Sequence, residues 1–189
     1  MPTAVRVAVL GDSLALSPTR ELNVASELEL RAAAAHLPVR VSNFSGWGDT
    51  TADGLRRLDS ALAITPHILV VQLGANDGLR GMAVDVVERN LDAILQRAQA
   101  RRVGVLLCGM EAPPVHGFTY TLEFHRLFPR LATRHQVPLV PFVLAGVVFN
   151  PEFNGPDGLH PNAAGARRMA ATIWPYLEPL IQQTALFAA

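Results

Sequence analysis

Residues 5–14 of the chain read Val-Arg-Val-Ala-Val-Leu-Gly-Asp-Ser-Leu. The first six are almost all apolar, which is typical of a strand buried on both faces, as the strands of parallel sheets are. Gly11 permits a tight turn after the strand, and the residues that follow can begin a helix. The stretch therefore predicts a strand–turn–helix unit that presents Asp12 and Ser13 at the carboxyl end of its strand.

Four further apolar runs of this kind occur at residues 39–43, 68–73, 103–108 and 139–143. Segments with helical periodicity separate them, and these candidate helices span residues 21–35, 52–63, 84–101, 122–135 and 162–174. The last of them is expected to end or kink near Pro175. This alternation predicts an α/β fold: a three-layer α/β/α sandwich around a five-stranded, mainly parallel, doubly wound sheet of the flavodoxin-like kind. We expect residues 1–189 to form a single domain.

Composition narrows the class of substrate. Half of the residues are apolar, and 16 Lys and Arg balance 16 Asp and Glu, without long runs of like charge. The balance argues against a nucleic-acid surface and favours a small neutral or amphiphilic substrate. We expect neither a cofactor nor a metal, because clustered metal ligands are not visible in the sequence. The oligomeric state cannot be read from the sequence.

The single cysteine, Cys108, follows an apolar run and is expected to be a buried thiol. The chain shows no apolar stretch of the length that an integral membrane segment needs, and its N-terminal apolar run is too short for a signal peptide. As written the sequence predicts a cytoplasmic protein, or a periplasmic or secreted one from which a signal was removed.

Two polar motifs carry the groups needed for nucleophilic catalysis. In Gly11-Asp12-Ser13-Leu14, the serine hydroxyl would stand at the edge of the sheet, although Asp-Ser after a strand is also an ordinary helix cap. In Asp157-Gly158-Leu159-His160-Pro161, the carboxylate can accept a hydrogen bond from imidazole Nδ1, which leaves Nε2 free to act as a base. The alternative is a turn capped by Asp157 with a surface histidine.

Two other motifs could supply hydrogen-bond donors to an oxyanion. Asn76, in Gly74-Ala75-Asn76-Asp77, can point its amide at the sheet edge, and a glycine N–H in residues 45–50 could be a second donor. Turn chemistry explains either motif taken alone. Because the carboxyl ends of parallel strands lie at one edge, all four motifs are expected to converge into a site for acyl transfer.

Together these blocks resemble the SGNH (GDSL) hydrolase family, whose motifs occur in order at residues 11–14, 48, 74–77 and 157–160. The chain is similar in particular to a bacterial branch of arylesterases and multifunctional thioesterase/lysophospholipases. That likeness is carried by residues 48–51, 54–55, 72–81 and 137–142, and it extends over nearly the whole chain. The chain departs from the branch at residues 15–18, where a small residue, a glycine and an aromatic are usual.

The resemblance implies a serine esterase with Ser13 as nucleophile, His160 as base and Asp157 as the group that orients it. It also implies an oxyanion hole built from the Ser13 N–H, the Gly48 N–H and the Asn76 side chain. The implied substrate is a small acyl ester or thioester, with aryl esters, short-to-medium acyl esters and lysophospholipids as candidates.

The walls of the acyl pocket are expected among apolar residues near the same edge, and plain core packing is the alternative for each. The candidates are Leu79, Met110, Pro113, Phe142, Phe149 and Phe153. Residues 78–82 contain two glycines, Gly78 and Gly81, and by resemblance the segment is expected to move when an acyl chain binds. The alternative is a rigid turn in which Arg80 pairs with a nearby carboxylate.

Two other functions use the same fold. An SGNH acyltransferase or perhydrolase would pass the acyl group to an alcohol or peroxide instead of water. A carbohydrate- or partner-binding module would have lost a triad residue, and all three are present in the sequence.

Overall fold

The computed structural model describes residues 4–187. Its sheet has the order β2-β1-β3-β4-β5, and every neighbouring pair of strands is parallel. The strands are β1 (Val5–Gly11), β2 (Val39–Asn43), β3 (Ile68–Gln72), β4 (Gly104–Cys108) and β5 (Leu139–Val140). This is the flavodoxin-like strand order, in which ligands bind at the carboxyl ends of the strands near the β1/β3 switch point.

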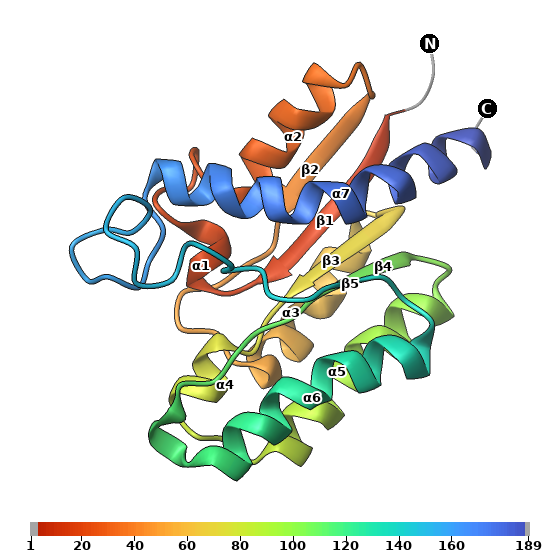
Figure 1. Cartoon of the computed structure of the whole chain (residues 1–189). Helices are drawn as coiled ribbons and strands as arrows, with labels where there is room; N and C mark the ends of the chain where they lie inside the picture. The colour runs from red at the N-terminus through yellow and green to blue at the C-terminus, as the bar shows by residue number, and fades with distance from the viewer. Residues whose placement is uncertain (1–3, 188–189) are drawn as a thin grey trace.

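The helices lie in two layers, with α2 and α7 on one face of the sheet and α3, α5 and α6 on the other (Figure 1). They are α1 (Ser13–Leu16), α2 (Val24–Ala34), α3 (Thr51–Ala63), α4 (Ala75–Leu79), α5 (Val84–Ala100), α6 (Phe118–His135) and α7 (Ala163–Phe187), with a 3-10 turn η1 (Pro114–His116). The predicted three-layer α/β/α sandwich is therefore confirmed. The short helices α1 and α4 follow β1 and β3 directly, so both begin at the carboxyl edge of the sheet.

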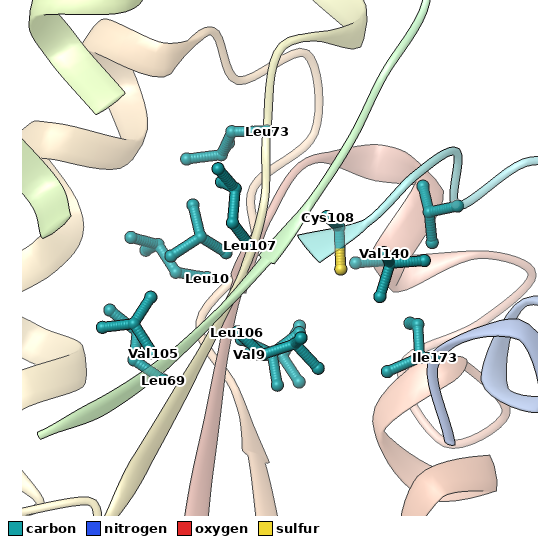
Figure 2. Packing of buried hydrophobic residues seen from close by; sticks show 14 of the residues in the cluster. Val9, Leu10, Leu69, Leu73, Val105, Leu106, Leu107, Cys108, Val140 and Ile173 are labelled. Atoms are coloured by element: carbon teal, nitrogen blue, oxygen red, sulfur yellow. The ribbon is translucent and has the colours of Figure 1, made fainter. Parts of the chain in front are cut away.

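The core forms because the strands are apolar on both faces. Figure 2 shows Leu10 and Leu107 on one side of the sheet, and Cys108, Val140 and Ile173 on the other. All five side chains are fully buried in one continuous apolar cluster. The expected buried thiol of Cys108 is thus confirmed, and burial raises its pKa above the ordinary range.

Several predicted boundaries are wrong, among them the starts of α2, at Val24 instead of residue 21, and of α6, at Phe118 instead of residue 122. The fifth strand was expected over residues 139–143 but covers only Leu139–Val140. It stops because Pro141 has no N–H for the ladder, and the Val143 N–H then turns back to the Gly109 carbonyl.

The final helix, α7, was expected to end or kink near Pro175 but continues to Phe187 with Pro175 and Pro179 inside it. Leu177 and Ile181 lie beyond the first proline and are buried in the core, which offsets the backbone hydrogen bonds that the prolines cannot make. Within residues 4–187, no helix combines the length and the apolar character that crossing a membrane would require.

Candidate active site

The structure brings Ser13, His160 and Asp157 into one hydrogen-bonded line. Ser13 is the first residue of α1, and its Oγ lies 2.9 Å from Nε2 of His160. Nδ1 of the same imidazole lies 2.6 Å from Oδ2 of Asp157. Residues separated by 147 positions thus meet because β1 and the segment before α7 both end at the carboxyl edge of the sheet.

The turn that carries His160 is built around Asp157. Its Oδ1 accepts the backbone N–H groups of Leu159 and His160, both at 3.0 Å, and Gly158, between Asp157 and Leu159, adopts φ +70°. The hydrogen bond from the His160 side chain, followed by these two backbone bonds, lowers the Asp157 pKa from 3.8 to about 2. The carboxylate therefore stays ionised at neutral pH and accepts a hydrogen bond from Nδ1–H of His160, which favours the tautomer protonated at Nδ1.

Two backbone amides near Ser13 are available to bind an oxyanion. Within the described part of the chain, neither the Ser13 N–H nor the Gly48 N–H donates to a protein acceptor. The Ser13 N–H is free because Ser13 begins a helix, and the first N–H groups of a helix have no partner within it. Gly48 adopts φ +72°, which favours glycine at that position.

Asn76 provides a third group on the same side of the site. One hydrogen of its Nδ2 is donated to the Asp49 carbonyl at 2.9 Å. This bond joins the Asn76 block to the Gly48 block, and the second Nδ2 hydrogen stays available for another acceptor.

Beneath these groups lie two buried carboxyls. Asp77 accepts both the N–H (2.9 Å) and the Oγ1–H (2.7 Å) of Thr51, which joins α4 to the start of α3. Asp12 accepts the Leu14 N–H at 3.0 Å through Oδ1, while its Oδ2 is buried without a hydrogen-bond partner among the described residues. Burial, assisted by the nearby charges of Asp77 and Asp49, raises the Asp12 pKa to about 7.

An apolar cavity of about 270 Å³ is lined by Leu14, the residue after Ser13. Of the predicted pocket residues, Leu79, Met110, Pro113, Phe142 and Phe149 line it. Phe153 does not; it packs partly buried against the core, and its carbonyl accepts the Asn162 N–H near the start of α7. The N–H groups of Phe153 and Asn154 also both donate to the Asn150 carbonyl, so this part of the loop after β5 is bonded to itself.

The chain sequence matches the GDSL-like Lipase/Acylhydrolase family over residues 9–168, a range that includes every motif of the site. It belongs to this family. Membership makes the protein a carboxylic ester hydrolase and confirms the resemblance seen in its motifs.

Known relatives of this GDSL hydrolase cover most of its length. It is 39% identical to "Esterase TesA" of Pseudomonas aeruginosa over 94% of this chain and 90% of that protein. It is 37% identical to "Thioesterase 1/protease 1/lysophospholipase L1" of Escherichia coli over 75% of this chain and 68% of that protein. A crystal structure of TesA superposes with a TM-score of 0.86 at 38% identity, covering 93% of this chain and 99% of that one.

Residues 78–82 of the hydrolase are held from two sides. Arg80 Nη2 donates to the Gly48 carbonyl at 3.2 Å, and His116 Nε2 lies 3.0 Å from the Leu79 carbonyl. Gly81, at φ +63°, lies so close to His116 that an added Cβ would come within 2.7 Å of its imidazole. These contacts describe one state of the segment, and its movement on substrate binding stays a prediction.

The sequence motifs did not reveal several neighbours of the site. Leu144, Val148 and Leu159 also line the cavity. Leu159 stands between Asp157 and His160, so its position in the motif was a usable signal. Trp47 lies against the His160 ring with centroids 5.7 Å apart, and the sequence offered no signal for that contact.

Proposed function

We propose that the protein hydrolyses small acyl esters through an acyl-serine intermediate on Ser13, with His160 as base and Asp157 as its orienting partner. The observation that carries the proposal is the continuous line of hydrogen bonds from Ser13 Oγ through His160 to Asp157, at 2.9 and 2.6 Å. Such a nucleophile, base and orienter within hydrogen-bond reach are the signature of an activated hydroxyl.

In acylation, His160 Nε2 takes the Ser13 hydroxyl proton while Oγ bonds to the substrate carbonyl carbon. The π electrons move onto the carbonyl oxygen, which would be held by the Ser13 N–H, the Gly48 N–H and the free hydrogen of Asn76. The tetrahedral intermediate then collapses, the bond to the leaving oxygen breaks, and that oxygen takes the proton from Nε2.

In deacylation, the same groups act on water. His160 removes a proton from water as the water oxygen attacks the acyl carbon, and the acid leaves as Ser13 recovers its proton. The side chains of His160 and Asp157 are 33% and 52% exposed, so water can reach the acyl-serine. This openness favours hydrolysis over transfer to an alcohol or peroxide, which would be better served by a dry site.

The apolar cavity supports a short-to-medium acyl chain. Its volume of about 270 Å³ is just under the roughly 300–1,000 Å³ of pockets for drug-sized ligands. Glu111 is the one ionisable side chain among its lining residues, so a neutral acyl group suits it best. The names of the relatives extend the proposal to thioesters and lysophospholipids.

The proposal is tested by replacing the nucleophile. Ser13→Ala should lose more than 99% of the activity on p-nitrophenyl acetate and keep the circular dichroism spectrum of the wild type. Ser60→Ala, a serine on α3 outside the hydrogen-bonded line, is the matched control and should keep wild-type activity. A folded Ser13→Ala protein with more than a hundredth of wild-type activity would contradict the assignment.

Acyl-chain preference and acceptor are tested separately. The wild-type protein should hydrolyse p-nitrophenyl esters from acetate to palmitate with a maximum at short or medium length. An acyl-CoA series beside it measures thioester activity. Alkyl esters as the main product in the presence of added alcohol would instead indicate an acyltransferase.

A further inference from the structure

Trp47 is a large aromatic residue at the mouth of the site that the proposed mechanism does not use. It lies in the connection between β2 and α3, flanked by Gly46 and Gly48, and it is 58% exposed. Its ring lies 5.7 Å from the His160 ring, centroid to centroid, with the planes inclined by 50°. This distance is within the 4.5–7 Å typical of aromatic contacts, yet more than half of Trp47 remains uncovered.

The site has an acyl side, formed by the cavity, and a second side around His160, where Trp47 lies. Leu14 and Leu159, the chain neighbours of Ser13 and His160, line the cavity, and Trp47 is not among its described lining residues. Instead, Trp47 is next to Gly48 in the chain and contacts His160, so it borders the proposed oxyanion donors and the base.

The geometry of acyl transfer places the leaving group on that second side. The attacked carbon carries Ser13 Oγ, the oxyanion, the acyl chain and the leaving oxygen. The acyl chain suits the apolar cavity, and the oxyanion suits the free amides. The leaving oxygen must lie within reach of His160 Nε2, because that nitrogen gives it a proton. The group attached to this oxygen therefore emerges beside His160, where Trp47 stands.

We propose that Trp47 is a specificity-determining residue whose exposed indole ring receives a flat aromatic leaving group, so that aryl esters are favoured over alkyl esters of the same acid. The inference rests on the proposed ester hydrolysis and adds the class of leaving group to it. A ring on the leaving oxygen can pack against the indole, while an alkyl group of similar size buries area there without the aromatic contact.

The experiment compares two acetates whose leaving alcohols have similar acidity: phenyl acetate and an acetate of a fluorinated alkyl alcohol. Trp47→Leu removes the ring and keeps an apolar side chain, and Trp47→Phe restores an aromatic face. The ratio of kcat/KM for the aryl ester to that for the alkyl ester should fall about fivefold in Trp47→Leu, mainly through a higher KM. In Trp47→Phe most of the ratio should return.

Phe118→Leu is the matched control, since Phe118 is an 80% exposed aromatic at the start of α6 and does not line the acyl cavity. It should leave the ratio unchanged. An unchanged ratio in Trp47→Leu would overturn the inference. An equal loss on both esters would also overturn it, because Trp47 would then act only through His160.

A measurement without turnover separates this inference from the proposed function. Phenol binding to Ser13→Ala protein, followed by NMR titration, should weaken about fivefold when Trp47→Leu is added. If the wild-type protein hydrolyses neither acetate while this binding difference is present, the proposed function fails and the Trp47 site stands. If both acetates are hydrolysed and phenol binding is unaffected by Trp47→Leu, the Trp47 inference alone fails.

Discussion

Asp157 holds the imidazole of His160 in one tautomer, and an amide in its place would reverse that hydrogen bond. In Asp157→Asn, the imidazole can shift its proton to Nε2, which then no longer accepts the Ser13 proton. We expect kcat for p-nitrophenyl acetate to fall by about 10²–10⁴-fold, with no greater loss than in His160→Ala, because the orienter is removed and the base remains. Asp59→Asn, on the exposed face of α3, is the control. A larger loss in Asp157→Asn than in His160→Ala would reassign the two roles.

The pH at which Asp157 matters follows from its lowered pKa. Because the folded value is about 2 and the ordinary value is 3.8, the stabilising effect of this carboxylate is present above pH 4 and is lost as pH falls through about 2. Asp157 therefore stays ionised at every pH at which esterases are ordinarily assayed.

Asp12 should make stability depend on pH in the opposite sense. Its folded pKa of about 7 exceeds the ordinary 3.8, so the unfolded chain ionises first and stability falls as pH rises from about 4 to about 7. Asp12→Asn keeps an oxygen acceptor for the Leu14 N–H and removes the titration. The free energy of unfolding of the variant relative to wild type should rise across this range by up to about 4 kcal/mol, then level off. Urea denaturation from pH 4 to pH 8.5 measures it, and a difference that does not vary with pH would refute the expectation.

At the scale of elements, α4 contributes Ala75 and Leu79 to the lining of the apolar cavity that we propose for the acyl chain. Leu79 ends α4, lines the cavity and is 44% exposed, so a bound chain can cover it. In Leu79→Ala, kcat/KM for octanoate or decanoate esters should fall about tenfold, and that for acetate should change little, because a two-carbon acyl group does not extend along the cavity. Leu30→Ala, at an exposed position on α2, is the control. Chain-length profiles that coincide with wild type would favour a rigid segment in which Leu79 takes no part.

At the scale of the whole molecule, the part of α7 that follows its two prolines packs against the core. Ile181 is 1% exposed and belongs to the continuous apolar cluster, although it follows both Pro175 and Pro179. Ile181→Ala should lower the free energy of unfolding by about 2–5 kcal/mol, and Leu186→Ala, at an exposed position on the same helix, should have little effect.

Guanidinium unfolding followed by circular dichroism and by activity should give one coincident transition if the chain is a single domain. Two separate transitions would contradict that expectation.

The amino-acid sequence determined the fold class and predicted the candidate reacting residues, because the signals for both are local. Apolar strand runs such as residues 5–10 identify a parallel sheet, and Ser13 and His160 each lie in a short motif whose turn chemistry can be read directly. Pocket walls were harder to predict, because an apolar side chain serves a cavity and a core equally well; Phe142 lines the cavity and Phe153 does not.

Tertiary structure alone decided the features that depend on what lies across the molecule. The course of α7 beyond Pro175 depends on burial of Leu177 and Ile181, which outweighs the local preference of proline. The contact of Trp47 with His160 joins positions 113 residues apart, and no local sequence pattern encodes it. Local motifs specify which groups are present, whereas only the packing of distant segments specifies which of them meet.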